Sequence, residues 1–284
     1  MESNRLPSAY LQTAKRFFDP LVERLERERQ QQTGPLFVAL NGSQGSGKST
    51  LAEYLAQSLI HERKLSTVVL SLDDFYLTRV ERQELAQSVH PLLRTRGVPG
   101  THDLTLLART LDSMSAEGSM KVPRFDKSQD DRVPEERWDS YEVPSDIVIL
   151  EGWCLGATGD DRAALERPLN DLERDEDSDG RWRTYTDAAL KNAYLPLYKR
   201  FDIWLMLRAP SFDEVLRWRT EQEEKLRASV GEGGAGLMND AALRRFVAHY
   251  ERHTRQCLRD LPQRVDVLLN LDEHRQILSC RGLP

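Results

Sequence analysis

Short runs of apolar residues recur along the chain, separated by longer stretches in which apolar positions follow a helical spacing. The runs are residues 36–40, 67–72, 146–150, 202–207 and 265–269. Most are rich in Val, Ile and Leu without polar alternation, which is typical of strands covered on both faces. The helical spacing is clearest over residues 50–59, 212–227 and 241–261. Strands that alternate with helices predict an α/β fold: a doubly wound, mainly parallel five-stranded sheet flanked by helices.

The segments around this pattern predict how a single domain, 1–284, is organised. A helix over about 6–32 is expected before the first strand. The region 76–145 lacks a clear strand and contains several prolines, among them Pro91, Pro99, Pro123 and Pro134, so we expect an insertion that lies over the edge of the sheet and forms the substrate region. The acidic segment 171–180 has almost no apolar content and predicts an exposed or partly disordered loop. The glycine-rich segment 231–236 predicts a flexible break between two helices.

Composition narrows the class of protein. Hydrophobic residues make up 39% and charged residues 30% of the 284 residues, as in a soluble globular protein. A net charge of -6 argues against a nucleic-acid partner, so any anion site must be local. The three cysteines lack metal-ligand spacing, which indicates neither a disulfide framework nor zinc. No signal peptide and no run of 18 apolar residues occurs, so we expect a cytoplasmic protein without membrane association. The oligomeric state stays open, with a monomer as the working expectation.

A phosphate-binding loop follows the first apolar run. Residues 42–49 fit the pattern GxxxxGK[ST] between a predicted strand and a predicted helix, the context that this pattern requires. Glycines let backbone N–H groups surround a phosphate, while Lys48 would reach the β- and γ-phosphates and the Ser49 hydroxyl would bind Mg²⁺. The expected nucleotide-binding residues are Gly42, Ser43, Gln44, Gly45, Ser46, Gly47, Lys48, Ser49 and Thr50. A glycine-rich turn that binds nothing is the alternative. The chain contains no NKxD tetrapeptide, which favours ATP over GTP.

Carboxylates follow two of the predicted strands. Asp73 and Asp74 end the second strand, at the sheet edge where open α/β sheets bind ligands. A phosphoryl acceptor needs a carboxylate to orient its hydroxyl and take its proton, and we prefer Asp73 for this role. Glu151 ends the third strand against an apolar run, where Mg²⁺ shared with Ser49 would compensate its burial. A strand-end cap and a structural salt bridge are the competing explanations for these acids.

Basic residues between the second and third strands suit an anionic acceptor, because Arg binds carboxylates and phosphates with paired donors. The expected substrate-binding residues are Asp74, Tyr76, Arg96, His102, Asp103 and Arg124. Ordinary surface charges on loops are the alternative for these basic residues.

A lid is expected over about 211–229, where Arg217 and Arg219 lie near the start of a helix. Closure would bring positive charge to the transferring phosphoryl group and exclude water. We therefore add Arg217, with Asp73 and Lys48, to the predicted catalytic residues. A place on the helix surface is the alternative for each arginine, and Trp218 between them is expected in the core.

In these residues and their order, the chain resembles the phosphoribulokinase/uridine kinase group of P-loop kinases, and within it the D-glycerate 3-kinases. The matching segments are NGSQGSGKST, LSLDDFYLT, HPLLRTRGVPGTHDLTLL, KVPRFDKS, VILEGWCLG, RWRTEQE, FVAHYERHT and VDVLLNLDEHR. They run from residue 36 to about 275. The phosphate loop is generic to the fold, whereas the DDFYLT, RGVPGTHD and EGWCLG segments are more specific.

The resemblance implies an ATP- and Mg²⁺-dependent transfer to a primary hydroxyl, with Asp73 in the place of the group's catalytic aspartate. For D-glycerate the product would be 3-phosphoglycerate. Phe125 stands where the group has tyrosine, which leaves other acceptors open: pantothenate, a nucleoside or a sugar phosphate. A nucleotide-dependent switch or assembly factor is a further alternative, and the acidic pair beside the phosphate loop counts against it.

Overall fold

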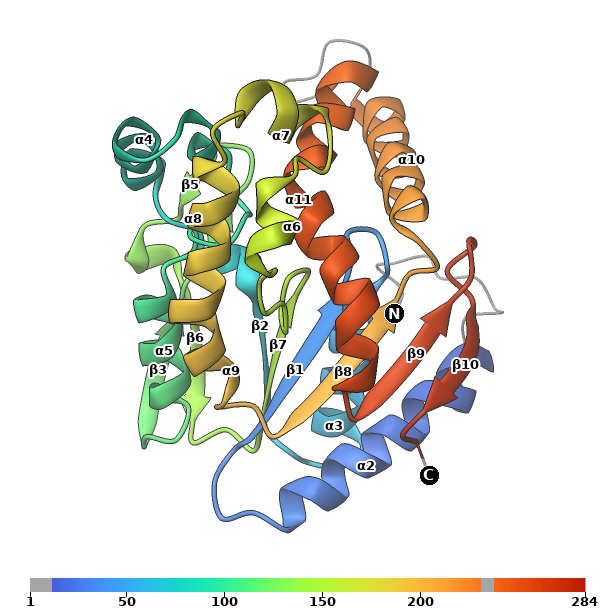
Figure 1. Ribbon diagram of the computed structural model, residues 1–284. Coiled ribbons are helices and arrows are strands. Elements are labelled where there is room, and N and C mark those ends of the chain that lie inside the picture. Colours follow the sequence, from blue (N-terminus) through green and yellow to red (C-terminus); the bar gives the residue numbers. More distant parts are fainter. Residues whose placement is uncertain (1–11, 231–237, 284) are drawn as a thin grey trace.

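The computed structural model describes residues 12–230 and 238–283, and a six-stranded sheet forms their centre (Figure 1). The strands run in the order β10-β9-β8-β1-β7-β2. Five of them match the predicted runs: β1 (Leu36–Gly42), β2 (Thr67–Ser71), β7 (Ile147–Gly152), β8 (Ile203–Arg208) and β9 (Val267–Leu271). Each neighbouring pair among these five is parallel, which confirms the doubly wound α/β fold.

The prediction of five strands was one short. The sixth strand, β10 (Ile277–Arg281), pairs antiparallel with β9 at the edge of the sheet. Its side chains are exposed or half-buried, and its pairing is irregular between Ile277 and Ser279. A short edge strand of this kind has no continuous apolar run, so periodicity does not reveal it.

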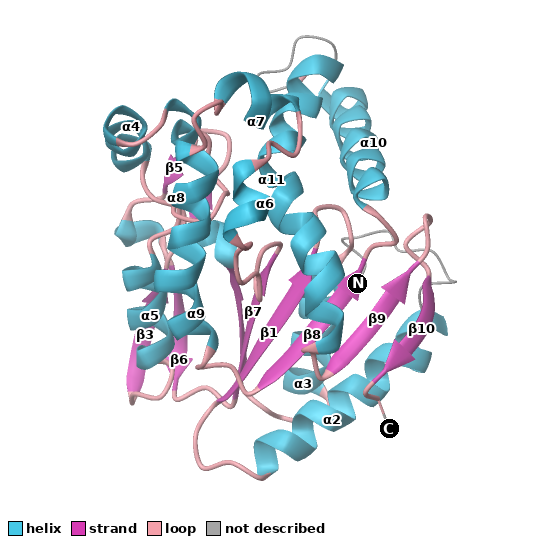
Figure 2. Ribbon diagram, viewed as in Figure 1, coloured by secondary structure: helices cyan, strands magenta, loops and turns pink. Residues whose placement is uncertain are grey.

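Helices cover both faces of the sheet (Figure 2). Alternate residues of the same strands point to opposite faces and pack in two separate hydrophobic cores. Val38 and Ile149 pack with α2 and α3 on one face, whereas Ala39 and Val148 pack with α5 and α8 on the other. The bounds are α2 (Asp19–Gln30), α3 (Lys48–His61), α5 (Leu104–Ser113), α6 (Arg162–Glu166), α7 (Asp171–Glu176), α8 (Arg181–Ala189) and α9 (Leu195–Tyr198). Burial on both faces is the physical reason for strands without polar alternation. Across the described residues, no helix combines the length and the apolar character that crossing a membrane requires.

Helices occupy the two segments where a terminal helix and a lid helix were expected, and the lid role stays a prediction. Within the expected span 6–32, a π-helical turn over Ala14–Phe18 leads into α2, and residues before 12 lie outside the described part. The expected lid segment forms α10 (Phe212–Val230), and α11 (Asp240–Asp260) returns across the sheet. The predicted break at 231–236 lies outside the described residues.

The insertion 76–145 contains strands, so the expectation of none was wrong. It lies beside the edge strand β2 (Figure 1) and holds α4 (Arg79–Ser88) and α5. Its strands form two small antiparallel sheets: β3 (Gly118–Val122) with β6 (Asp139–Val143), and β4 (Phe125–Asp126) with β5 (Asp131–Arg132). Two of these strands have only two residues, and the others are mostly exposed, which leaves little apolar signal in the sequence.

The acidic segment 171–180 is not an exposed loop, which corrects the prediction. Residues 171–176 form α7, and Glu173 is only 1% exposed. Its carboxylate receives two hydrogen bonds from Arg252 of α11, at 2.7 and 2.6 Å. Asp177 is also buried, where it accepts hydrogen bonds from the Trp182 N–H and from Arg183. The segment is ordered by remote arginines that its own composition does not reveal.

We predict that Glu173→Gln destabilises the fold, because the change leaves the buried guanidinium of Arg252 without its full counter-charge. Removing one partner of a buried ion pair costs about 3–5 kcal/mol in the free energy of unfolding. Asp171→Asn is the matched control, since Asp171 lies on the same helix with its side chain 85% exposed. Urea unfolding of both variants measures the difference, and equal stability of the two would contradict a structural role for this pair.

Candidate active site

The phosphate loop joins β1 to α3 and adopts a conformation that its glycines permit. Gly45 and Gly47 have φ angles of 79° and 90°, in the left-handed region that favours glycine. Gly47 is also the N-cap residue of α3 and provides no side-chain acceptor to the first turn of that helix. The first N–H groups of α3 therefore remain available to an anion, which the positive end of the helix dipole also attracts.

Gly42 permits the loop to fold tightly. A Cβ atom at this position would lie 2.6 Å from the Ser46 hydroxyl and 3.1 Å from the Lys48 Cβ. The hydroxyls of Ser43 and Ser46 and the side-chain oxygen of Gln44 are buried without a hydrogen-bond partner. Unsatisfied polar groups in a buried loop are costly unless a ligand meets them. The loop thus has the form and the free polar groups that a polyphosphate site needs.

Glu151 joins the phosphate loop to the neighbouring strands. Its Oε1 accepts hydrogen bonds from Ser49 at 2.9 Å and from Ser71 at 3.0 Å. Its Oε2 is buried without a hydrogen bond and lies 3.6 Å from the Lys48 Nζ. The structure brings Ser49 and Glu151 together, as expected for a shared metal ion. A hydroxyl oxygen and a carboxylate with one free buried oxygen are hard ligands that fit Mg²⁺.

Asp73 lies in a 3-10 turn, Leu72–Phe75, directly after β2. Its Oδ1 accepts a hydrogen bond from the Tyr76 hydroxyl, and its Oδ2 accepts one from Lys127, each at 2.6 Å. Burial alone would raise the pKa of Asp73, but the charges of Lys127 and Lys48 and the two hydrogen bonds lower it to about 2. Asp73 is therefore ionised at neutral pH.

Asp74 lies in the same 3-10 turn and has different partners from Asp73. Its carboxylate accepts hydrogen bonds from Arg124 at 2.8 Å and from the Phe125 N–H at 3.0 Å. Burial raises the pKa of Asp74 despite these two partners. Asp74 thus anchors the β4 end of the insertion to the end of β2. Arg124 also binds Asp139 at 2.6 Å.

Tyr76 and His102 form one buried aromatic group. Their ring centroids are 4.9 Å apart, and the His102 Nδ1 lies 2.6 Å from the Tyr194 hydroxyl. Burial lowers the pKa of His102 to about 4, so this ring is neutral at physiological pH. Asp103, beside it, caps α5 through the Leu106 N–H at 2.9 Å and binds Arg132 at 3.2 Å. Of these predicted substrate-binding residues, Tyr76 is the one that contacts Asp73 directly.

Arg96 belongs to a second cluster beside Phe125. Its guanidinium binds Asp130 and lies over the Phe125 ring, 5.6 Å from the centroid. Its carbonyl accepts a hydrogen bond from the Tyr250 hydroxyl of α11 at 2.9 Å. Phe125 also packs edge-on against Tyr76 at 5.1 Å. The phenyl ring thus connects the Arg96 cluster to the residues around Asp73.

The two lid arginines point in different directions. Arg217 binds Glu214 at 2.7 Å and donates to the Glu273 carbonyl, and neither partner belongs to the phosphate loop. Arg219 is less exposed, binds Glu223 at 3.1 Å and lies over Phe246 of α11. Burial raises the pKa of Tyr250, and the charges of Arg96 and Arg219 oppose that effect. Arg219 therefore faces α11, whereas Arg217, our sequence-based choice, is held at the Glu273 carbonyl.

Lys127 is one of the basic residues between the second and third predicted strands, but the sequence did not indicate its contact with Asp73. Sequence reasoning missed Arg275. It donates to the Gly45 carbonyl at 2.9 Å, binds Glu221 of α10 at 2.7 Å and lies 5.1 Å from the Trp218 ring centroid. Arg275 thereby connects the β9–β10 turn and α10 to the phosphate loop. Trp218 is fully buried, as predicted.

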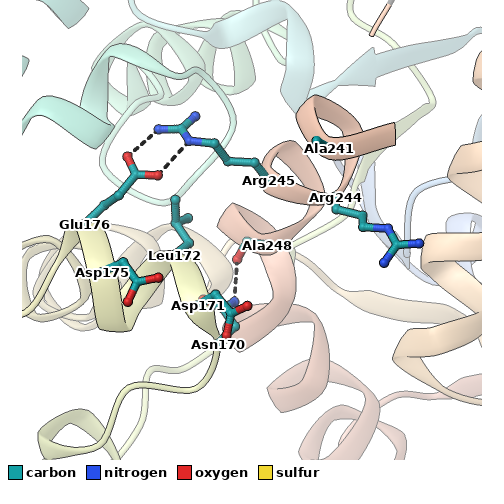
Figure 3. Close-up of a pocket in the computed structure, with 9 residues that line it drawn as sticks. All are labelled: Asn170, Asp171, Leu172, Asp175, Glu176, Ala241, Arg244, Arg245 and Ala248. Carbon is teal, nitrogen blue, oxygen red and sulfur yellow. Dashed lines mark hydrogen bonds and ion pairs between the residues drawn. The ribbon is translucent and has the colours of Figure 1, made fainter. Parts of the chain in front are cut away.

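The described residues form cavities away from the phosphate loop, and the following pair is well defined. The first, of about 480 Å³, lies between α7 and α11 (Figure 3). There Arg245 binds Glu176 through two hydrogen bonds, and Arg244 points away from them. The second, of about 470 Å³, is a groove whose lining includes His102 and Tyr194. Only the second includes residues that the sequence predicted for the acceptor.

Comparison with known proteins identifies the family. A profile of the phosphoribulokinase/uridine kinase family matches residues 37–165. A protein of Schizosaccharomyces pombe named as an uncharacterized kinase, mug58, is 33% identical over 246 residues, covering 82% of this chain and 84% of that protein. The chain belongs to the phosphoribulokinase/uridine kinase family. The chain is also 32% identical over 229 residues to the chloroplastic D-glycerate 3-kinase of Arabidopsis thaliana, and this match covers 76% of the chain and 46% of the Arabidopsis protein.

A solved structure agrees over nearly the whole of the kinase. The D-glycerate 3-kinase of Cryptococcus neoformans var. grubii superposes with a TM-score of 0.75 at 25% identity, covering 97% of this chain and 99% of that one. The fold and the family together make this protein an ATP-dependent phosphotransferase that acts on an alcohol, of the D-glycerate 3-kinase-like kind.

We predict that Gly42→Ala weakens ATP binding without unfolding the kinase, because the added methyl group would displace Ser46 and distort the loop. The expected rise in the dissociation constant is about tenfold or more, equivalent to about 1.4 kcal/mol. Isothermal titration calorimetry measures it. Gly34→Ala is the control, because no atom lies within 4 Å of a Cβ atom placed at Gly34. If Gly42→Ala binds ATP as tightly as the wild type does, the result would contradict the importance of tight packing within this loop for ATP binding.

Proposed function

We propose that this kinase transfers the γ-phosphoryl group of ATP to the primary hydroxyl of D-glycerate and produces 3-phosphoglycerate. The observation that carries the proposal is the ionised carboxylate of Asp73, which lies at the carboxyl edge of the sheet within the field of Lys48. A carboxylate in this place is suited to orient an acceptor hydroxyl toward a nucleotide held by the phosphate loop.

Asp73 acts as the general base. It accepts the proton of the hydroxyl as the hydroxyl oxygen forms a bond to the γ-phosphorus. The bond between that phosphorus and the oxygen bridging the β- and γ-phosphates breaks, and ADP leaves. A positioned base of this kind contributes about 10²–10⁴-fold in rate.

Positive charge supports the transferring group. Lys48 would contact the β- and γ-phosphates, and Arg219 would approach from the lid when α10 closes. Ser49 and Glu151 would hold Mg²⁺, which when bound neutralises charge on the phosphate oxygens. These groups stabilise charge without making covalent bonds, which is the usual division of work in phosphoryl transfer.

A small anionic acceptor is favoured by the density of basic side chains around Asp73. Arg96, Arg124 and Lys127 all come from the insertion, in a protein whose net charge is -6. Two relatives named D-glycerate 3-kinase support glycerate as the acceptor. Pantothenate, a nucleoside and a sugar phosphate are the alternatives to be tested beside it.

We predict that D-glycerate stimulates ADP release and that Asp73→Asn abolishes the stimulation. The expected fall in kcat is about 10²–10⁴-fold, because the amide cannot take the hydroxyl proton. ATP affinity should stay within about threefold of wild type, since the hydrogen bonds of Asp73 are with Tyr76 and Lys127 and not with the phosphate loop. Asp112→Asn is the control: this carboxylate lies on α5, pairs with Arg200 and is 64% exposed.

Coupled-assay kinetics with each acceptor measures these changes. Stimulation by another acceptor but not by D-glycerate would move the proposal to that acceptor. Turnover that needs no acceptor and survives Asp73→Asn would favour a nucleotide-dependent switch and overturn the proposal.

We also predict that Arg219→Ala lowers kcat more than Arg217→Ala does. Arg219 lies over Phe246 of α11, and we expect it to reach the transferring group when α10 closes, whereas Arg217 is held by Glu214 and the Glu273 carbonyl. Loss of a charge-stabilising group costs about 10²–10³-fold in kcat. Steady-state kinetics of the two variants compares them, and an equal or larger loss in Arg217→Ala would restore the assignment made from the sequence.

A further inference from the structure

Both carboxylate oxygens of the proposed base accept a hydrogen bond from a side chain of the protein. Tyr76 donates to Oδ1 and Lys127 donates to Oδ2, each at 2.6 Å. A general base works best when its pKa lies near the working pH, and an ammonium group bound to a carboxylate opposes protonation. The base must therefore lose at least part of this positive contact when the acceptor binds.

The two donors differ in their freedom to move. Tyr76 is only 4% exposed and is held between His102 and Phe125. The Lys127 side chain is 60% exposed, and its hydrogen bond and ion pair are with Asp73. A flexible, exposed lysine can leave a carboxylate at little cost, because water solvates its ammonium group. Lys127 is therefore the donor that can be displaced.

The backbone around Lys127 is fixed, so the movement is confined to its side chain. The Asp126 carboxylate accepts hydrogen bonds from the Ser128 N–H at 2.8 Å and from the Gln129 N–H at 3.3 Å. On the other side, Asp130 binds the buried Arg82 at 3.0 Å. The ammonium group of Lys127 can therefore move by rotation of its side chain while the backbone of Lys127 stays in place next to Asp73.

The other cations of this cluster are bound to other acids. Arg124 binds Asp74 and Asp139, Arg132 binds Asp103, and Arg96 binds Asp130. Lys127 differs from these arginines because its partner is the proposed base itself. Any anion that attracts Lys127 changes the state of Asp73 directly.

We propose that Lys127 makes the kinase selective for anionic acceptors by moving from Asp73 to the acceptor's carboxylate. This inference rests on the proposed function. In D-glycerate, one carbon separates the carboxylate from the carbon that bears the reacting hydroxyl. With that hydroxyl at Asp73, the carboxylate lies close to the place that the ammonium group already occupies. A neutral acceptor such as glycerol offers no charge to attract Lys127, which stays on the base and slows the transfer.

The test compares D-glycerate and glycerol as acceptors for wild type and Lys127→Met. In the wild type, kcat/KM should favour D-glycerate strongly. In Lys127→Met, kcat/KM for D-glycerate should fall about 10²-fold, because a charged contact is lost, while kcat/KM for glycerol stays the same or rises. The preference for the anion should therefore collapse by about 10²-fold or more. Lys121→Met is the control, because Lys121 is an exposed lysine of the same insertion that donates to the Glu135 carbonyl.

A pH profile separates this role from a structural one. Without Lys127, burial of Asp73 is opposed by less positive charge, so its pKa rises. The acid limb of kcat/KM should then move to higher pH in Lys127→Met, and it should stay in place in Lys121→Met.

Equal losses for the two acceptors, or an unchanged preference, would overturn the inference. If the wild-type enzyme does not phosphorylate D-glycerate, that result overturns the proposed function instead. Lys127 is then tested in the same way with the acceptor that the wild type does phosphorylate and its uncharged analogue. A wild type that phosphorylates no anionic acceptor overturns both.

Discussion

The carboxylate of Glu151 is buried at the carboxyl end of β7, where it accepts hydrogen bonds from Ser49 and Ser71 and lies near Lys48. The parallel register places Glu151 beside Ser71 of β2 and beside Leu40 of β1. One buried acid therefore connects two strand ends with the first turn of α3. A buried carboxylate is costly without partners, so these contacts hold the phosphate loop and the end of β2 in a fixed relation.

The position of the proposed base follows from this constraint. Asp73 lies two residues beyond Ser71, in the turn that follows β2 and within the field of Lys48 of the phosphate loop. Its ionised state depends on opposing effects: burial raises its pKa, and Lys127, Lys48 and the hydrogen bond from Tyr76 together lower it. In the proposed mechanism, an acid that takes a proton is surrounded by lysines that favour its anionic form. An anionic acceptor would change that balance of charge as well as fill the space beside Asp73, which would link substrate charge to the chemistry.

The sequence predicted the parts of the protein that depend on local pattern. The apolar runs gave the five parallel strands, and the spacing of glycines and Lys48 gave the phosphate loop at the end of β1. The placement of Ser49 beside Glu151 could also be expected, because the ends of neighbouring parallel strands meet at one edge. These features are set by neighbouring residues or by a simple rule of topology.

What the sequence could not predict depends on contacts between distant residues. Glu173 can be buried because it pairs with Arg252, which is 79 residues away in the sequence. Arg275 donates to the carbonyl of Gly45, which is 230 residues away in the sequence. The choice between Arg217 and Arg219 depends on the rotation of α10 about its axis, which Trp218 fixes by packing into the core. The strands β4 and β5 are too short for any periodicity to show.

A crystal structure with a non-hydrolysable ATP analogue and D-glycerate tests the central claim most directly. The account predicts that the primary hydroxyl oxygen of D-glycerate lies within hydrogen-bond distance of the Asp73 carboxylate and in line with the γ-phosphorus. A complex in which Asp73 turns away from the acceptor, or in which no second molecule fits beside the γ-phosphate, would contradict it.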